Sequence, residues 1–255
     1  MVTNNKGTGV KTAETLINVI EYLREEDGAR VTEVADGLSI AKSTAHRHLT
    51  TLRERKYVQK EGDIYRLGFR FLHLGIHTRT RREAYHLVKE KVRYLAEETD
   101  ERAQFIIEEH GRGVFIFRER GQNAVETNTE VGKPIPLHTS SSGKAILANL
   151  PKSRANEIIE NQGLPPMTQY SITDKEELCT DLAEIRDRGY SVNNQENLEG
   201  LRAMGVPVED KNGRILGALS VSGPLKRMKN EWFQRDLPEI LQGTANELEL
   251  NIAYL

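Results

Sequence analysis

The pattern in residues 31–66 constrains the fold of this 255-residue chain more than any other. It predicts a short helix over residues 31–37, a three-residue turn, and a second helix over residues 41–55. Small and apolar residues at helical spacing give the second helix one buried face, formed by Ala41, Ala45, Leu49 and Leu52. Its opposite face consists of Lys42, Ser43, Thr44, His46, Arg47, Thr50 and Arg53. Such a helix fits the major groove of DNA, because nearly all of its outer side chains can hydrogen-bond a phosphate or a base edge.

Two short β-rich runs follow this helix and predict a wing. They lie on either side of the turn Glu61-Gly62-Asp63. A further amphipathic helix over residues 10–26 precedes the pattern. Three helices and a wing predict a winged helix-turn-helix domain over residues 10–70, preceded by a flexible tail of residues 1–9.

The charge distribution agrees with a nucleic-acid partner. Residues 39–93 carry 14 Lys and Arg against 5 Asp and Glu, a net charge of +9, whereas the whole chain stands at −2. Residues 1–38 and 94–255 have net charges of −3 and −8. A basic block between two acidic segments is the electrostatic footprint of a polyanion-binding site. The alternative is a solvated charged face, and the groove-compatible helix inside the block favours the polyanion site.

Composition narrows the class further. A hydrophobic content of 37% and a charged content of 29% indicate a folded chain and not a wholly disordered one. No apolar run approaches the roughly 18 residues of a transmembrane helix, and the polar N-terminus lacks the apolar core of a signal peptide. The single cysteine, Cys179, has no second cysteine for an intrachain disulfide. These features predict a cytoplasmic protein with no membrane partner.

The C-terminal part of the sequence predicts a different architecture. An amphipathic helix over residues 82–98 is expected within a linker and dimerisation region of residues 71–98. From residue 99 onwards, β-rich runs alternate with helical segments, which predicts an α+β domain around a central sheet. Two of its strands are expected near residues 203–208 and 214–222, and a closing helix over residues 231–254.

Three passages carry a more specific resemblance. They are Ala41-Lys42-Ser43-Thr44-Ala45-His46-Arg47, then Leu137-His138-Thr139-Ser140-Ser141-Ser142-Gly143-Lys144-Ala145-Ile146-Leu147-Ala148, and then Arg188-Gly189-Tyr190 through Glu199-Gly200-Leu201-Arg202, Val206-Pro207-Val208 and Gly217-Ala218-Leu219-Ser220-Val221-Ser222-Gly223-Pro224. The first alone is weakly specific, because winged helices are common. In this order and spacing, the passages resemble the IclR family of bacterial and archaeal transcription regulators, from about Val10 to the end of the chain.

The resemblance implies a winged-helix domain joined by a helix to a GAF-like α/β effector-binding domain over residues 99–255. It also implies dimers or tetramers that bind pseudo-palindromic operators in double-stranded DNA and respond to a small molecule. No cofactor is expected. Asn193 stands where the family often has an acidic residue, Ala203 where it often has a cysteine, and Ala41 where a proline is frequent. The first two departures leave the ligand open.

Seven residues are predicted to contact DNA. They are Lys42, Ser43, Thr44, His46, Arg47, Lys60 and Arg66. The three residues in the first turn of the recognition helix suit phosphates, because free backbone N–H groups lie there. Arg47 is the candidate for base readout, since its guanidinium matches guanine O6 and N7, and His46 reaches a base or a phosphate. Lys60 on the wing and Arg66 behind it are expected to contact the DNA backbone.

Ten residues are predicted at an effector site. Ser220 and Ser222 lie two apart on a strand whose faces are both apolar or small, so their buried hydroxyls need partners. Ser141, Ser142 and Gly143 open a helix whose N-terminal N–H groups can hold an anion. The resemblance adds Asn193, Leu201 and Ala203, with Ala124 and Thr127 at the edge. We expect a small carboxylate as the ligand, although the serines can instead cap their own helix and bond locally.

The same residues bear on other possible functions. Ser142-Gly143-Lys144 lacks the spacing of a phosphate-binding loop, and Lys144 is expected to be a solvated helix residue. His73 and His77 lie four apart, but no cysteine or acidic residue stands at ligand spacing beside them, so no metal site is expected. The predicted function is a ligand-responsive transcriptional regulator that acts as a repressor. The alternatives are an activator of the same architecture and, with less support, an enzyme acting on a small acid through the C-terminal domain.

Overall fold

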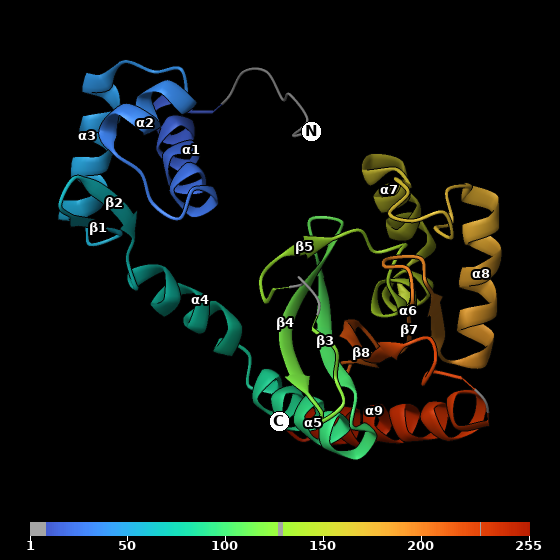
Figure 1. The fold of residues 1–255 in the computed structure, drawn as a ribbon. Helices are drawn as coiled ribbons and strands as arrows, with labels where there is room; N and C mark the ends of the chain where they lie inside the picture. Colours follow the sequence, from blue (N-terminus) through green and yellow to red (C-terminus); the bar gives the residue numbers. More distant parts are fainter. Residues whose placement is uncertain (1–8, 127–129, 230) are drawn as a thin grey trace. The chain divides into compact units, whose positions relative to one another are not determined.

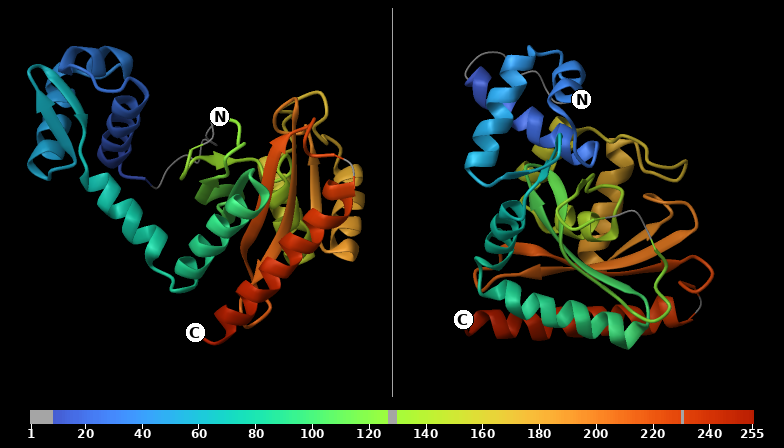
Figure 2. Two further views of the ribbon diagram at one scale, coloured as in Figure 1. Left: turned by 60° about the horizontal axis from the view of Figure 1, so that its bottom comes forward. Right: turned by 60° about the vertical axis from the view of Figure 1, so that its left-hand side comes forward.

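The computed structural model describes residues 9–126, 130–229 and 231–255, and the chain divides into two units between Arg81 and Arg82 (Figures 1 and 2). The elements of the first unit are α1 (Lys11–Glu25), α2 (Val31–Gly37), α3 (Lys42–Glu54), β1 (Val58–Glu61), β2 (Ile64–Leu67) and α4 (Arg70–Thr80). β1 and β2 pair antiparallel as the wing. The predicted winged helix-turn-helix is therefore confirmed.

The core of the first unit forms where the three helices meet the wing. Val19 and Leu23 of α1 pack with Leu49 of α3 and with Tyr65 of β2. The predicted buried face of α3 needs one correction, because Ala41 is an exposed N-terminal cap and His48 is buried in the helix instead. Burial lowers the pKa of His48, and the neighbouring charge of Arg47 lowers it further.

The second unit is built around one antiparallel sheet. Its elements are α5 (Ala84–Thr99), β3 (Arg102–Glu109), β4 (Arg112–Arg120), β5 (Pro134–Ile135), α6 (Ser141–Asn149), α7 (Lys152–Gln162), α8 (Lys175–Arg188), β6 (Ser191–Asn194), β7 (Leu201–Glu209), β8 (Ile215–Pro224), a π-helical turn (Trp232–Asp236) and α9 (Leu237–Ala253). The strand order is β5-β4-β3-β8-β7-β6, with antiparallel neighbours throughout. The expected α+β domain is confirmed.

Helices cover both faces of this sheet. α5 and α9 lie side by side on one face, where Val92, Leu241 and Leu248 pack against Phe105 and Leu219 (Figure 1). α6, α7 and α8 cover the other face, and their apolar residues form a separate core with Ile106, Phe115 and Ala218 of the sheet. β8 is buried between these two layers, as its sequence predicted. Across the described residues, no helix is both long and apolar enough to cross a membrane.

The face pattern of β8 differs from the expected one at its start. Strict alternation predicts that Leu216 shares a face with Ser220, whereas Leu216 belongs to the α5–α9 core and Ile215 packs toward α6. The reason is an irregularity in the pairing of β7 with β8, where the register shifts between Val208 and Glu209. Such a shift reverses the side-chain alternation beyond it. Ser220 and Ser222 lie after the irregularity and keep their shared face.

Candidate DNA-binding surface and effector cavity

The outer face of α3 is open to solvent. Lys42, Ser43, His46 and Arg47 are all exposed, and Thr44 is half-buried. Ala41 caps the helix without a side-chain hydrogen bond, so no described residue accepts the backbone N–H groups of Lys42 and Ser43. Free N–H groups at a helix N-terminus attract anions, and two of the exposed side chains add positive charge. This surface has the chemistry needed for a DNA backbone and a groove.

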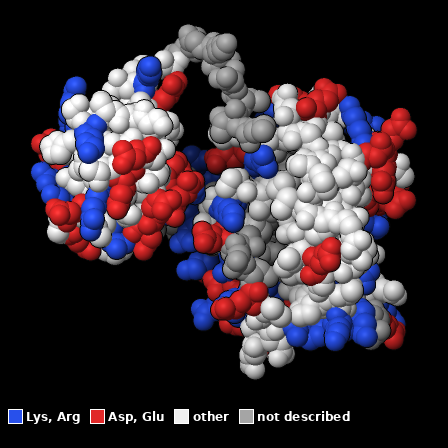
Figure 3. Space-filling view, turned by 45° about the horizontal axis from the view of Figure 1, so that its top comes forward, with Lys and Arg blue, Asp and Glu red and all other residues white. Residues whose placement is uncertain are grey.

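The two predicted wing residues differ in their surroundings. Lys60 is exposed, with its ammonium 5.4 Å from the ring centre of Tyr65. Arg66 instead forms ion pairs with Asp27 at 3.1 Å and Glu61 at 3.5 Å, and it also donates to the backbone carbonyl of Asp27. The guanidinium of Arg66 is therefore engaged within the unit, and the geometry favours Lys60 as the phosphate contact. On the face of this unit visible in Figure 3, basic and acidic side chains are intermixed.

A cavity lies in the second unit where the N-terminus of α6 meets the sheet. Its volume is about 50 Å³. Seven predicted residues line it: Ser141, Ser142, Asn193, Leu201, Ala203, Ser220 and Ser222. The close approach of α6 to β7 depends on Gly205, because a Cβ atom there would stand 2.8 Å from the backbone of Ser141 and Ser142. The structure thus brings together serines that lie about 80 residues apart in the sequence.

Hydrogen bonds order the serines at this end of the cavity. Ser140 caps α6 by accepting the N–H of Gly143 at 3.0 Å. Ser142 Oγ donates to Ser220 Oγ at 2.7 Å, and Gln104 Nε2 donates to Ser222 Oγ at 3.4 Å. The N–H groups of Ser141 and Ser142 have no acceptor among the described residues. The positive end of the α6 dipole therefore lies at the cavity wall.

Gly143 has a different place from the predicted one. It does not line the cavity, and its N–H is already bound by Ser140. A Cβ atom at this position would stand 2.1 Å from the carbonyl oxygen of Leu137 and 2.6 Å from the Leu137 Cα atom. Gly143 is thus required for backbone packing at the start of α6, and its N–H is not available to a bound anion.

Asn193 lines the cavity but is bound into the protein by both ends of its amide. Its Nδ2 donates to the carbonyl of Thr139, and its Oδ1 accepts the N–H of Glu196 at 3.1 Å. The side chain therefore links the turn before α6 to the loop after β6. Asn193 shapes the wall of the cavity through these two contacts.

Several residues that line the cavity were not predicted. The most informative is Arg118, since it brings a positive charge to the wall. Its Nε donates to Gln104 Oε1 at 3.4 Å, and Gln104 pairs across the sheet with both Arg118 and Ser220. Burial, together with the neighbouring charges of Arg102 and Arg120, lowers the pKa of Arg118 to about 10, so the guanidinium stays charged at neutral pH. Only the hairpin register, which is not visible in the sequence, could have placed Arg118 beside the serines.

Two predicted edge residues are not part of the cavity wall as described. Ala124 lies in the connection after β4 and does not line the cavity. That connection is held in place by Arg227, which donates to the carbonyl of Asn123 at 2.6 Å, and by Arg102, which donates to the carbonyl of Val125. Thr127 lies outside the described residues.

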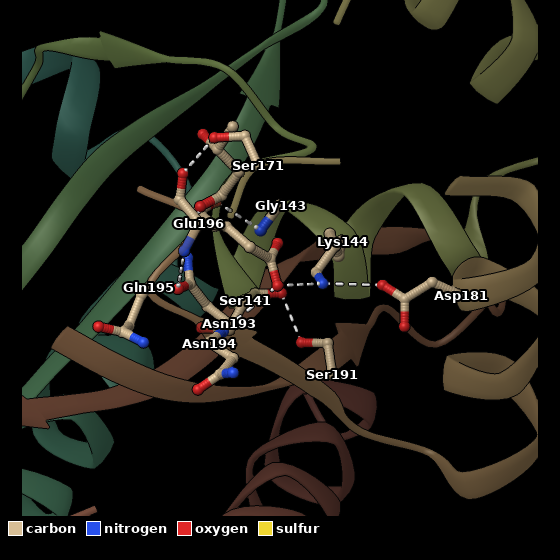
Figure 4. Close-up of polar contacts among 12 residues, drawn as sticks. Ser141, Gly143, Lys144, Ser171, Asp181, Ser191, Asn193, Asn194, Gln195 and Glu196 are labelled. Atoms are coloured by element: carbon tan, nitrogen blue, oxygen red, sulfur yellow. Dashed lines mark hydrogen bonds and ion pairs between the residues drawn. The ribbon is translucent and has the colours of Figure 1, made fainter. Parts of the chain in front are cut away.

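Lys144 is buried, which corrects the expectation of a solvated side chain. Only 2% of it is exposed, and its ammonium contacts Asp181 and Glu196 (Figure 4). The hydroxyl of Ser142 is bonded to Ser220 and not to Lys144. Ser142 and Lys144 therefore lack the hydrogen bond through which a lysine would activate a serine nucleophile.

Acid is expected to destabilise the second unit through His138. This side chain is 3% exposed, and desolvation lowers its pKa; the hydrogen bond to the carbonyl of Pro165 opposes this shift, and the charges of Lys144 and Arg112 add to it. The unfolded chain therefore binds a proton at higher pH than the folded one, and stability falls as the pH drops below the unfolded value near 6.5. Thermal unfolding between pH 8 and 5.5 should show a smaller decrease in Tm for His138→Gln, which keeps a donor for the carbonyl of Pro165. An equal decrease in both proteins would contradict this role.

A winged helix with an open recognition face and a separate α/β domain with a small-molecule cavity define a class, the DNA-binding transcriptional regulators that sense a ligand. Residues 12–62 match the family model of the IclR helix-turn-helix domain, and residues 77–250 match that of the bacterial transcriptional regulator IclR C-terminal domain. The chain belongs to the IclR family of transcriptional regulators.

Individual relatives agree over most of the chain. A probable HTH-type transcriptional regulator, ArcR of Halobacterium salinarum, is 30% identical over 92% of this chain and 91% of its own length. The transcriptional repressor IclR of Escherichia coli is 26% identical, covering 84% of this chain and 80% of its own. Among solved structures, an IclR homologue from Microbacterium hydrocarbonoxydans in complex with 4-hydroxybenzoate has a TM-score of 0.83 at 22% identity, over 96% of this chain and 100% of its own. This last similarity concerns the fold.

Proposed function

We propose that this protein is a repressor that binds a small carboxylate in the second unit and adjusts its affinity for an operator accordingly. In this proposal residues 10–70 bind DNA, residues 71–98 link and pair subunits, and residues 99–255 bind the effector. The observation that carries it is the cavity wall, to which Arg118, the first turn of α6, Ser220 and Ser222 all contribute. Together these groups supply positive charge and donors for a carboxylate.

The apolar part of the wall fits the carbon end of such a ligand. Leu198, Leu201 and Ala203 line the cavity beside Ile106 and Phe115. A few polar groups set among apolar side chains are the usual makeup of a small-molecule site. The 4-hydroxybenzoate complex of the Microbacterium relative supports a carboxylate in this fold. The relatives named as repressors, IclR of Escherichia coli among them, support the proposed sign of regulation.

A second copy of this chain is proposed as a partner. α4 contains no buried residue, and its apolar side chains Leu72, Leu74 and Ile76 are 57%, 43% and 42% exposed. An 11-residue helix of this kind is marginal by itself and gains stability from a covering surface. A two-fold pair of chains presents two recognition helices to the two halves of a palindromic operator, about 34 Å or a multiple of that apart.

On the DNA side, the proposed contacts are Lys42, Ser43, Thr44, His46, Arg47 and Lys60. Arg66 is proposed as a secondary contact. The open N-terminus of α3 supports phosphate contacts at Lys42 and Ser43. Arg47 is exposed one turn further along the helix and suits a guanine.

The effector proposal predicts that small carboxylic acids stabilise the protein through Arg118. A saturating acid at about 100 times its Kd adds about 2.7 kcal/mol, which raises Tm by roughly 5–10 °C. We expect Arg118→Gln, and separately Ser220→Ala/Ser222→Ala, to weaken binding at least roughly tenfold, because charge-assisted hydrogen bonds are lost. Thermal-shift titration of a panel of acids and their amides measures this.

Arg120→Gln is the matched control for this titration. Arg120 is an exposed neighbour that does not line the cavity, so its loss should leave the affinity nearly unchanged. Equal stabilisation by the acids and their neutral amides, or equal binding to Arg118→Gln, would overturn the carboxylate assignment.

A further inference from the structure

Lys144 makes the most deeply buried ion-pair contacts of the second unit's described residues. Its side chain leaves α6 and reaches Asp181 Oδ2 on α8 at 2.7 Å and Glu196 Oε1 at 2.8 Å (Figure 4). Glu196 belongs to the loop between β6 and β7, and only 6% of it is exposed. One ammonium group therefore joins a helix, a second helix and a loop that are distant in sequence.

Glu196 is the central residue of that loop. Its N–H donates to Asn193 Oδ1 at 3.1 Å, and its carbonyl accepts the hydroxyl of Ser171 at 2.7 Å. Its carboxylate also accepts the N–H of Asn194 at 3.3 Å. Backbone and side chain are thus bound at the same time, which makes Glu196 a main attachment of the loop, beside the hydrogen bonds that Thr168 and Leu225 donate to the carbonyls of Gln195 and Gly200 at its two ends.

The loop also forms one wall of the cavity. Asn197 and Leu198 follow Glu196 directly, and both line the cavity. Asn197 donates to Thr139 Oγ1 only at 3.5 Å, and Leu198 is 48% exposed, so neither side chain is held firmly by its own contacts. The position of this wall therefore depends on the attachment at Glu196.

Electrostatics make that attachment depend on Lys144. The second carboxylate oxygen of Glu196, Oε2, is buried and has no partner among the described residues. Burial raises the pKa of Glu196, and the charge of Lys144 opposes that rise. Without the ammonium group, a buried carboxylate would lose its main compensating charge, and the loop would move to reach water.

We propose that Lys144 is the positioning residue of the effector cavity: its buried ammonium group holds Glu196 and, through it, the wall formed by Asn197 and Leu198. The description of this wall as part of an effector site rests on the proposed function, whereas the ordering of the loop does not. Lys144 lies two residues after Ser142, so a single short helix contributes both its own first turn and the residue that holds Glu196 to the cavity wall.

Hydrogen exchange of the full-length protein without ligand tests this role. In Lys144→Met, the amides of residues 195–200 should exchange at least roughly tenfold faster than in the wild type, while amides of the central strand β3 keep their protection. Gln195, Glu196 and Gly200 are suitable reporters, since each N–H has an acceptor within or beside the loop. The Tm is expected to fall by roughly 10 °C, because a buried ion pair is broken.

Two further variants keep the test decisive. Lys144→Met/Glu196→Gln removes the uncompensated carboxylate, so it should recover much of the Tm while the loop stays fast in exchange. Lys175→Met is the matched control, since Lys175 forms an exposed ion pair with Glu160 on the surface. It should leave the loop unchanged.

A purely structural role for Lys144 gives a different pattern. Equal acceleration over the whole domain, or wild-type protection of the loop in the folded single or double variant, would overturn the proposal. Because the comparison uses no ligand, it decides the role of Lys144 independently of the effector. Failure of every carboxylic acid to stabilise the wild type overturns the effector proposal alone.

Discussion

Arg47→Ala is expected to remove most of the sequence preference of operator binding while leaving binding to unrelated DNA largely intact. Arg47 is exposed on the outer face of α3, one turn from its N-terminus, and its guanidinium can form two hydrogen bonds with a guanine. Each such contact discriminates by roughly 1–3 kcal/mol, so the operator affinity of each half-site should fall by roughly 10–100-fold. Contacts to phosphates at the helix N-terminus remain and keep the binding dependent on salt.

Fluorescence anisotropy at matched salt, with operator and scrambled duplexes, measures this change. Arg53→Ala is the control on the same helix, because Arg53 is exposed but is not among the proposed contacts. Arg53→Ala should change the affinity for both duplexes slightly and equally. Unchanged operator affinity in Arg47→Ala would remove Arg47 from base readout.

A footprint of the wild type should show two half-sites separated by about one DNA turn or a multiple of it, and a single protected half-site would contradict the paired assembly.

Gly143→Ala is expected to destabilise the second unit strongly and to disturb its cavity. The added Cβ atom would stand 2.1 Å from the Leu137 carbonyl oxygen, a backbone atom that has no freedom to rotate away. α6 would have to shift, and its first turn carries Ser141 and Ser142 at the cavity wall. We expect a loss of about 3 kcal/mol of unfolding free energy, at the upper end of the usual cost of overpacking, together with loss of effector binding.

Gly243→Ala makes the same chemical change but is expected to have the opposite effect on stability. Gly243 lies on the exposed side of α9, with no atom within 4 Å of an added Cβ. Alanine is the better helix former by roughly 1 kcal/mol, so this variant should be slightly more stable than the wild type. Urea unfolding of both variants gives the comparison. A Gly143→Ala protein as stable as the wild type would show that α6 adapts without cost.

The first unit was predictable because its signals are local. Buried residues of α3 recur at helical spacing, and the wing turn is marked by Gly62 between two charged residues. α7 was missed although Ala155, Ile158 and Ile159 stand at helical spacing after Pro151, because the segment is otherwise polar. The sequence predicts α4 only as part of a linker region, because a helix without a buried face has no clear amphipathic pattern.

The cavity was only partly predictable, because its geometry depends on pairings between distant segments. Ser220 and Ser222 were recognisable as hydroxyls on a buried strand. Arg118 was not, since its place at the wall follows from the hairpin register around a bulge between Phe105 and Ile106. The sequence predicts a solvated Lys144 because the residues it contacts lie 37 and 52 positions further along the chain. Charge at a helical position indicates exposure only when no buried partner is present.

The residues that line the cavity differ in how closely the backbone packs around them, and this difference bears on how ligand preference can evolve. The backbone of Ser141 and Ser142 lies close to Gly205, where an added Cβ atom would stand 2.8 Å from it, so the first turn of α6 has no room to move toward β7. Leu201 and Ala203 also line the cavity, and their side chains make no hydrogen bond, since neither has a polar atom. Larger, smaller or polar residues at these two positions would therefore change the shape and chemistry of the cavity without altering the first turn of α6. The same two positions are where a designer of biosensors would begin a mutant library.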